Sequence, residues 1–413
     1  MDRVSPLAVL AASNVLLHFQ RLHGKSAFSI PQNTIMASGG GFTTFRWLCT
    51  IIGLIFYIGD IISDLLLTVQ YFRGGHCTWA VLTLVFIVSG SLCIQIFSYA
   101  WFEDDKKNEN YEDEDKPLST GHLIGIHVLQ IGIFTRYHHL LKRSYKALWL
   151  GQTQEDVQLR LFALATDLSM LRLFETFLES VPQLVLQLYI ILEYNHRSIL
   201  QYISMAMSFL NIAWATVDYR RCFRRSLPHV NEMPSRMPTA VYLLYKIFTI
   251  TPRILSLTIF IMLSTFSPLA MAFIWLVGTI WAHLEKTDFC ISPRLEHLYR
   301  ATVGIILLFT FFNIKGENTK VHMTVYYILT LSQNIAAPIM LFLFKPESEG
   351  TDYFLPMLFF IVFSNSMGLG FLALYYSLLH PRGVSRVADE IDGMHQEPLS
   401  PPKTTRLDRF LQI

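Results

Sequence analysis

Long apolar stretches recur along the chain at lengths that suit a lipid bilayer. A spanning α-helix needs ~20 mostly apolar residues, and eight stretches of about this kind are separated by polar segments. They cover residues 47–72, 79–102, 168–192, 199–217, 240–262, 269–284, 326–344 and 354–378. The pattern therefore predicts an all-α polytopic membrane protein with eight transmembrane helices.

Two shorter apolar stretches interrupt this series, Leu123–Phe134 and Ala301–Phe312. Each is too short to cross comfortably and is followed by polar residues that include Arg136 and Lys315, respectively. Such lengths favour re-entrant half-helices. Each half of the chain then has the same order of two spans, one re-entrant segment and two spans. We therefore expect two pseudo-repeats, 47–218 and 239–379, with any site near their interface.

Three polar segments complete the predicted organisation. We expect residues 1–46 to be a disordered cytosolic leader, 219–238 a basic loop and 380–413 a regulatory tail. Within the loop, a single acid, Glu232, accompanies five arginines: Arg220, Arg221, Arg224, Arg225 and Arg236. By the positive-inside rule this loop is cytosolic, and eight spans then place both termini in the cytosol as well.

Composition agrees with a membrane protein and excludes several other classes. Hydrophobic residues make up 52% of the chain, charged residues only 15%, and there are 31 Phe, which is unlike a soluble globular domain. The five Cys are odd in number and widely spaced, which suits neither a disulfide framework nor a CxxC metal site. His138 and His139 are adjacent, which is not helical metal spacing. We expect no metal, no cofactor and no nucleic-acid partner.

Polar residues nevertheless fall inside three of the predicted spans. Arg172, Glu175, Glu179, Gln183 and Gln187 advance by 3, 4, 4 and 4 residues and so share one helical face. The first span carries Asp60 and Asp64, and the fifth carries Lys246 and Arg253. Each charge near mid-bilayer costs at least ~2.5–3.5 kcal/mol, so these side chains will not face lipid tails.

Two interpretations of these stripes remain open from the residues alone. In the first, they are structural ion pairs in which Arg253 or Arg172 holds the acids Asp60, Asp64 and Glu175. In the second, they line a polar path along which a charged group moves. Both interpretations can be correct, because charged side chains that pair with one another can also bind a zwitterionic head group at successive positions.

Four segments carry a resemblance to the XK-related protein family. They are "DLSMLRLFETFLESVPQLVLQLYI", "VDYRRCFRRSLP", "FFNIKGENTK" and "YYSLLHP", and the resemblance covers about Phe45 to Gly393. It implies eight membrane helices plus two half-inserted ones in two repeats. Its caspase-activated branch consists of plasma-membrane phospholipid scramblases that expose phosphatidylserine during apoptosis, and some members work with a single-pass membrane partner.

The resemblance also implies roles for particular residues of the stripes. It places Asp60, Asp64, Glu175, Glu179 and Arg253 in the lipid-translocation path. We expect the acids to attract the ammonium or choline end of a lipid and the bases to attract its phosphate. The complete network expected, as lipid path or as buried charge network, is Asp60, Asp64, Arg136, Arg172, Glu175, Glu179, Gln183, Lys246 and Arg253.

The tail carries a candidate regulatory site. Asp389, Glu390, Ile391 and Asp392, followed by the small Gly393, look like an executioner-caspase site with cleavage after Asp392. Polar terminal segments are where proteases reach. The part beyond the cut places Leu407, Phe410 and Leu411 at helical spacing, which fits either an amphipathic plug or a tail with scattered apolar residues. The resemblance favours the plug, because it implies a C-terminal segment that holds the protein inactive.

These observations favour a passive phospholipid scramblase that is not an enzyme, acting on phospholipids including phosphatidylserine and activated by an executioner caspase. The chain lacks a GxxxxGK phosphate-binding loop, in agreement with an energy-independent process. The rivals are an intramembrane enzyme with paired carboxylates, an ion or amino-acid transporter, and a structural subunit of a membrane complex. The caspase-like tail separates the scramblase from all three, because none of them needs it.

Overall fold

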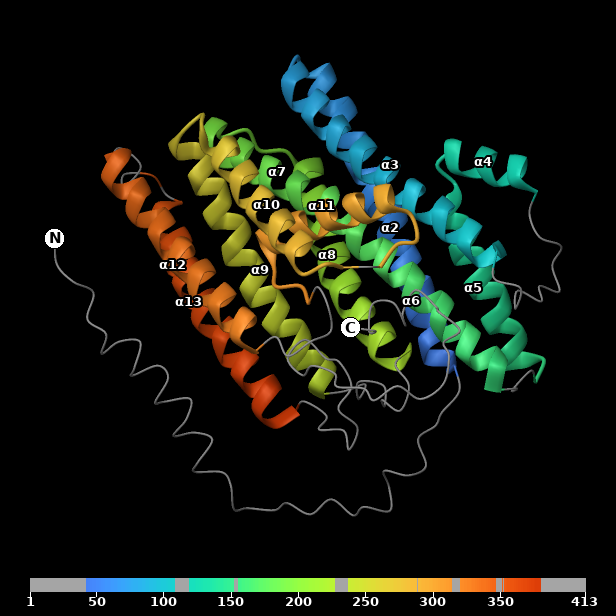
Figure 1. Ribbon diagram of the computed structural model, residues 1–413. Coiled ribbons are helices and arrows are strands. Elements are labelled where there is room, and N and C mark those ends of the chain that lie inside the picture. Colours follow the sequence, from blue (N-terminus) through green and yellow to red (C-terminus); the bar gives the residue numbers. More distant parts are fainter. Residues whose placement is uncertain are drawn as a thin grey trace, which may run out of the picture. The chain divides into compact units, whose positions relative to one another are not determined.

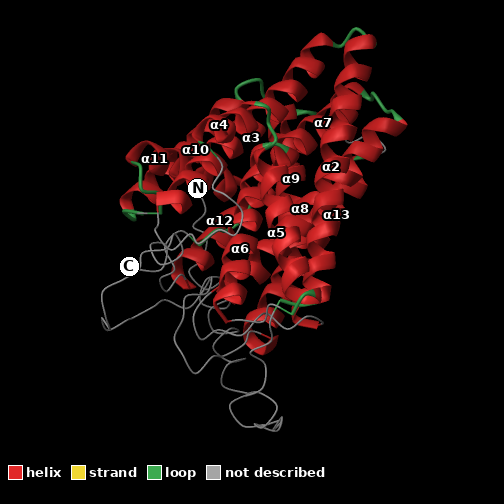
Figure 2. Ribbon diagram, turned by 90° about the vertical axis from the view of Figure 1, so that its right-hand side faces the viewer, coloured by secondary structure: helices red, strands yellow, loops and turns green. Residues whose placement is uncertain are grey.

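The described part of the chain is helical throughout. The computed structural model describes residues 42–107, 119–151, 155–226, 237–287, 289–313, 320–346, 351 and 353–379, and within these ranges it contains helices and no strand (Figures 1 and 2). All of these residues belong to one unit. The helices are α2 (Thr44–Arg73), α3 (Cys77–Lys107), α4 (Thr120–Val128), α5 (Gly132–Trp149), α6 (Glu155–Leu178), α7 (Ser180–Tyr194), α8 (Ile199–Ser226), α9 (Met237–Leu263), α10 (Ser267–Leu284), α11 (Pro293–Phe309), α12 (Lys320–Phe344) and α13 (Phe354–Leu374), and α13 ends in the π-helical turn η3 (Tyr375–Leu379).

Among the described residues, seven helical stretches are long and apolar enough to cross a membrane. They are α2, α3, α8, α9, α10, α12 and α13, the last continuing into η3. Many of their large apolar side chains are exposed, which a soluble protein would not tolerate over so many helices. The predicted all-α polytopic membrane protein is confirmed.

The eighth predicted span, 168–192, is divided between two helices. α6 ends at Leu178 and α7 begins at Ser180, with Glu179 between them at φ −119° and ψ −71°. Pro182 has no N–H, so the Leu178 carbonyl loses its ordinary donor one turn later. The Glu179 N–H still donates to the Glu175 carbonyl at 2.8 Å, and the Gln183 N–H to the Glu179 carbonyl at 3.0 Å. The break therefore puts a carboxylate at the junction of two helices.

The two short apolar stretches fold differently from each other. Residues 123–134 form the end of α4, a turn with Gln130 at φ +63°, and the start of α5. A Cβ on Gly132 would clash with the side chains of Gln95 and His127, so a larger residue there would force them to move. Residues 301–312 are the second half of α11 and the extended residues that follow it. Whether either segment is re-entrant, and whether the halves are repeats, stays a prediction.

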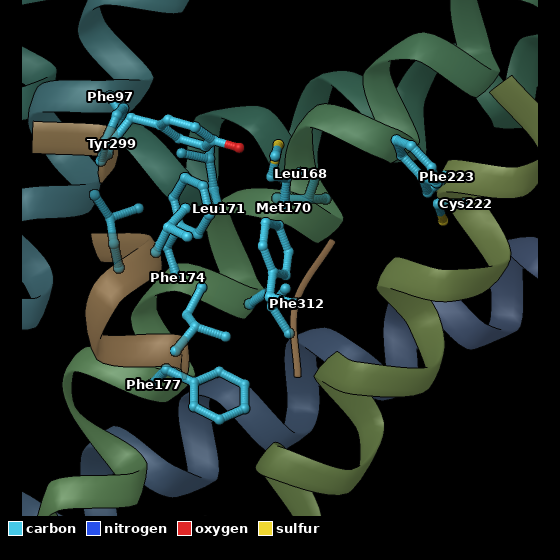
Figure 3. Close-up of a cluster of buried hydrophobic side chains, with 14 of the residues drawn as sticks. Phe97, Leu168, Met170, Leu171, Phe174, Phe177, Cys222, Phe223, Tyr299 and Phe312 are labelled. Atoms are coloured by element: carbon cyan, nitrogen blue, oxygen red, sulfur yellow. The ribbon is translucent and has the colours of Figure 1, made fainter. Parts of the chain in front are cut away.

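α6 lies at the centre of the largest hydrophobic core. It packs against α3, α5, α8 and α11, and its side chains from Leu168 to Phe177 are all buried (Figure 3). The Phe174 ring lies 5.2 Å from the Phe97 ring and 6.0 Å from the Tyr299 ring, centroid to centroid. Elsewhere α9 runs alongside α12 and α13 and packs on both (Figure 1). The core thus joins elements from both halves of the chain.

Two predicted boundaries need correction. Part of the predicted leader is packed, because Phe42 is buried against Phe162 and its N–H donates to the Gln158 Oε1 atom at 2.6 Å. α8 continues to Ser226, so Arg220 and Arg221 are helical and buried instead of lying in a solvated loop. Arg220 lies over the Tyr242 ring, and Arg221 donates to the Cys49 Sγ atom. These aromatic and thiol contacts explain why the arginines are drawn inward.

Candidate functional site

Four carboxylates lie inside the protein where α2, α6, α7 and α8 meet. Asp60 and Asp64 come from α2, Glu175 from α6, and Glu179 from the break between α6 and α7. Their exposed fractions are 1%, 0%, 1% and 2%, respectively. We call this group the acidic cluster. The sequence-predicted acids are therefore brought together and kept away from lipid.

Asp60 is the most fully satisfied member of the acidic cluster. Its Oδ2 atom accepts hydrogen bonds from Ser180 at 2.7 Å and Asn211 at 2.8 Å. Its Oδ1 atom accepts one from Ser208 at 2.8 Å. Three donors from two helices thus hold this carboxylate, and they compensate for much of the cost of burying it.

Arg172 supports the structural interpretation of the stripe. Its guanidinium forms an ion pair with Glu175 and donates to the Asn211 Oδ1 atom at 2.6 Å. The same group lies 3.9 Å from the centre of the Tyr57 ring. Asn211 in turn donates to Asp60, so Arg172 is linked to that carboxylate through one amide. The expected pairing of Arg172 with Glu175 is confirmed.

Other polar atoms of the same region lack hydrogen-bond partners among the described residues. The Asp64 Oδ1 atom accepts from Ser204 at 2.5 Å, but its Oδ2 atom is buried and unpaired. The same holds for the Glu179 Oε1 atom. The side-chain oxygens of Gln187 and Gln201 are also buried without a partner among the described residues. An unsatisfied buried polar group costs about 1–3 kcal/mol, so a row of them calls for a functional explanation.

The basic residues of α9 do not meet the acidic cluster. The Arg253 Nε atom donates to the Leu308 carbonyl at 2.8 Å, and its Nη1 atom donates to Gln333 at 2.7 Å. The Lys246 Nζ atom lies 3.3 Å from the Phe311 carbonyl oxygen. Both cations therefore hold the C-terminal end of α11, where helix carbonyls favour positive charge. Of the two bases expected to hold the acids, Arg253 is therefore not the one that does so, because its Nε and Nη1 atoms donate to the Leu308 carbonyl and to Gln333.

A small cavity with both polar and apolar lining residues lies in the second half of the chain. Its volume is about 10 Å³, close to what one water molecule needs. It is lined by residues of α9, α11, α12 and α13, among them Thr249, Thr310, Asn334 and Asn365. Asn334 donates to Asn365 at 3.1 Å, while its own Oδ1 atom is buried and unpaired. The second half of the chain thus has a polar interior of its own.

Arg136 of α5 contacts residues of α3 and α6. Its Nε and Nη2 atoms donate to the hydroxyl and carbonyl oxygens of Ser98 at 2.9 and 3.0 Å. Its Nη1 atom lies 3.8 Å from the Asp167 carboxylate, and its guanidinium lies 4.1 Å from the centre of the Phe102 ring. These contacts fasten α5 to α3 and α6, which is a structural role.

Sequence reasoning missed the partners that α8 supplies to the acidic cluster. Gln201, Ser204, Ser208 and Asn211 are all buried, and they advance by 3, 4 and 3 residues along one helix face. That spacing was visible in the sequence, but small hydroxyl residues in a span do not stand out as charges do. Among the described residues, no group of three or more His, Cys, Asp or Glu side chains is arranged to hold a metal ion.

The predicted tail features lie outside the described residues. These are the candidate cleavage site, Asp389 to Gly393, and the candidate plug residues Leu407, Phe410 and Leu411. They remain predictions from the sequence.

Comparisons with known proteins add a family context to this geometry. A family model described as XK-related protein matches residues 48–381. The chain is 46% identical over 362 residues to XK-related protein 9 of Tetraodon nigroviridis, covering 86% of this chain and 95% of that protein. It is 31% identical over 337 residues to XK-related protein 8 of the same fish, with coverage of 80% and 82%. It is also 31% identical over 352 residues to XK-related protein 8 of Pan troglodytes, with coverage of 83% and 86%.

Proposed function

The chain belongs to the XK-related protein family, and from that premise we propose that this multi-pass membrane protein is a passive phospholipid scramblase. In this proposal it resides in the plasma membrane with both termini in the cytosol. Removal of its C-terminal tail by an executioner caspase activates it, and phosphatidylserine then reaches the cell surface. Its resemblance to the caspase-activated branch of the family supports this assignment.

The observation that carries the proposal is the row of unpaired polar atoms on α2, α7 and α8. Asp64 and Glu179 present buried oxygens without partners beside the satisfied Asp60. Passive scrambling needs only a lower barrier for a charged head group in hydrocarbon. Unpaired carboxylates offer that group's ammonium or choline end an alternative to water, while the acyl tails stay in the membrane.

The cations of α9 have a complementary role in the proposal. Arg253 donates to the Leu308 carbonyl of α11 and Lys246 to the Phe311 carbonyl just beyond it, and both carbonyls are weaker partners than carboxylates. A lipid phosphate can compete for such donors. Ammonium-attracting and phosphate-attracting groups then lie on different helices, and a zwitterionic head group can engage both.

The described state is closed to a head group at the acidic cluster, since each of its four carboxylates is at most 2% exposed. Opening must therefore separate α2, α7 and α8. The break at Glu179 is a natural hinge for such a movement, because its backbone already departs from helical geometry. Cleavage after Asp392 converts a tethered plug into a free peptide and lowers its effective concentration, which removes support for the closed state.

The first test compares scrambling of fluorescent phosphatidylserine in proteoliposomes. The samples are intact protein, protein cut by an executioner caspase, and an Asp392→Ala variant treated with the same protease. We expect activity only in the cut sample. If the cut sample stays inactive in liposomes and becomes active in cells, a single-pass membrane partner is required. Inactivity in both settings contradicts the proposal, and ion flux through the same vesicles then tests the transporter alternative.

A second test distinguishes residues that line the lipid path from residues that only stabilise the fold. Asp64→Asn and Glu179→Gln each remove a negative charge from the unpaired row and should reduce scrambling by the cut protein at least about tenfold. Glu193→Gln is the matched control. Glu193 lies near the end of α7, is partly exposed and pairs with Lys345 at 3.1 Å, away from the acidic cluster. Equal loss in all three variants would show that charge alone, independent of position, matters.

A further inference from the structure

α5 has a composition unlike that of the helices around it. The described segment 119–151 that contains it has no Asp or Glu. One side of α5 is buried and includes Ile133, Tyr137, Leu140 and Ala147. The opposite side carries what we call the basic aromatic face, which consists of Lys142, Arg143, Tyr145, Lys146 and Trp149. Lys142 is exposed, Arg143 and Lys146 are half-buried, and Tyr145 and Trp149 are 50% and 49% exposed.

Neighbouring contacts place this face at one end of the helical assembly. The Trp149 ring stacks on Tyr145, 4.8 Å away, and meets the edge of Trp47 at 5.3 Å. The Trp47 Nε1 atom also donates to the Leu141 carbonyl at 3.4 Å. The end of α5 therefore adjoins the start of α2. This is the end that the positive-inside rule places in the cytosol.

The α4–α5 turn is apolar and exposed, in contrast with this end. Val128 and Leu129 are 73% and 69% exposed, which fits the prediction from the sequence that this turn is re-entrant and meets lipid tails. Gly132, the first residue of α5, and Lys142 are separated by 10 residues, which corresponds to roughly 15 Å along a helix. The hydrocarbon of one leaflet is about 15 Å thick. With its turn in the hydrocarbon, α5 thus places its basic aromatic face at head-group depth of the cytosolic leaflet.

The chemistry of the face matches that depth. Trp and Tyr gather at membrane interfaces, and Lys and Arg on an amphipathic helix attract anionic lipids, each by about fivefold in binding. We propose that the basic aromatic face of α5 binds anionic phospholipid head groups of the cytosolic leaflet. This binding stands whether or not the protein scrambles lipids. In a scramblase it gathers anionic substrate beside α2, the helix that carries Asp60 and Asp64.

The test uses full-length protein in phosphatidylcholine liposomes with a small amount of a photoactivatable, clickable lipid. One sample carries the phosphatidylserine probe and another the phosphatidylcholine probe. After illumination, chymotryptic peptides from residues 132–151 are quantified by mass spectrometry, so that changes at Lys or Arg leave digestion unchanged. We expect the phosphatidylserine probe to label these peptides at least about fivefold more than the phosphatidylcholine probe. Soluble inorganic phosphate should not compete, which distinguishes a lipid surface from a free-phosphate site.

Two triple variants make the test specific. Lys142→Gln/Arg143→Gln/Lys146→Gln should abolish the preference for phosphatidylserine, while labelling of peptides elsewhere in the protein is kept and so reports that the variant is folded. Arg73→Gln/Arg197→Gln/Arg294→Gln removes the same charge from exposed positions outside α5 and should leave the preference intact. Equal labelling of α5 by both probes overturns the proposal. If both triple variants lose the preference for phosphatidylserine equally, the proposal is also overturned, because the preference then depends on the net charge of the protein and not on α5.

Discussion

Asp60 and Glu179 are both buried carboxylates, but their surroundings are opposite. Asp60 accepts hydrogen bonds from Ser180, Ser208 and Asn211, whereas the Glu179 Oε1 atom has no hydrogen-bond partner among the described residues. The same isosteric change should therefore have opposite effects on the free energy of unfolding. This contrast distinguishes a residue placed for stability from one placed for function.

We expect Asp60→Asn to destabilise the protein by about 1–3 kcal/mol, because the new amide NH₂ faces donors and leaves them unpaired. Glu179→Gln should leave stability unchanged or raise it, because the Oε1 atom that it replaces accepts no hydrogen bond from the described residues, while scrambling falls. Thermal unfolding of the purified protein in detergent measures both changes. A melting temperature that falls equally for the two variants would contradict this assignment.

The ion pair between Arg172 and Glu175 gives a second prediction at this scale. Arg172→Gln leaves the Glu175 carboxylate buried without its partner, and it removes the bond to Asn211 and the contact with Tyr57. Breaking a buried pair in this way costs about 3–5 kcal/mol. Adding Glu175→Gln to the same variant should recover part of that loss, and Arg197→Gln at an exposed position should cost little. The double-mutant comparison is made by the same unfolding assay, and an absence of recovery would show that the pair is not the source of the loss.

The charged members of the site could be predicted from the sequence, but their partners could not. Helical spacing marked Asp60, Asp64, Glu175 and Glu179 because charges in an apolar stretch are conspicuous. It could not tell which base meets which acid, since that depends on the packing of distant helices. Arg253 illustrates this, because its donors go to the Leu308 carbonyl, and a backbone acceptor leaves no mark in the sequence.

At the scale of elements, α9 and α13 approach each other closely at one glycine. A Cβ on Gly368 would lie 2.8 Å from the Phe248 carbonyl oxygen, whereas a Cβ on Gly370 would meet nothing within 4 Å. The two positions lie in the same helix, two residues apart. They form a matched pair that isolates the effect of packing from that of helix propensity.

We expect Gly368→Ala to destabilise the protein by about 1–3 kcal/mol, because the added methyl pushes α13 from the backbone of α9. Gly370→Ala should be neutral or stabilise by up to about 1 kcal/mol, because alanine favours the helix and no neighbour opposes it. Thermal unfolding of both variants in the same detergent compares them. Similar melting temperatures for the two variants would mean that this close approach does not limit stability.

Hydrophobic periodicity located most of the elements, and its misses have local causes. The stretch 168–192 is apolar throughout, so nothing in its periodicity shows a division between α6 and α7. Pro182 was the only local sign of it, and the backbone departs from helical geometry three residues earlier, at Glu179. The polar end of α8 was assigned to a loop because arginines are usually solvated, whereas here Tyr242 and Cys49 contact Arg220 and Arg221.

At the scale of the whole molecule, the acidic cluster and the two buried cations of α9 belong to different halves of the chain. The acidic cluster lies on α2, α6 and α7, and the cations Lys246 and Arg253 lie on α9. α7 and α9 pack against each other, so the two groups share a helical boundary without forming a direct ion pair. A head group that carries both charges is the ligand class that such a separation suits. This relation could not be predicted from the sequence, which contained the charges but not the packing between halves.

The proposed orientation in the membrane rests on the arginines that precede α9, and the accessibility of a cysteine to a maleimide can test it. If the termini are cytosolic, α2 runs outward and the turn between α2 and α3 faces the cell exterior. Cys77 begins α3 and is exposed, while Cys49, Cys222 and Cys290 are buried. A membrane-impermeant maleimide should therefore label Cys77 on intact cells, and Cys77→Ser should abolish most of this labelling.

The reverse control uses the opposite end of the molecule. Leu150 is 66% exposed just beyond α5 and beside the start of α2, so Leu150→Cys in the Cys77→Ser background should react only after the cells are permeabilised. Labelling of Cys77 only after permeabilisation, with Leu150→Cys reactive on intact cells, would invert the orientation. The basic aromatic face of α5 would then meet the outer leaflet, which lacks the anionic lipid that it fits. The same inversion would place the tail with Asp392 outside the cell, away from any caspase, so this measurement bears on the gating and the lipid-binding proposals together.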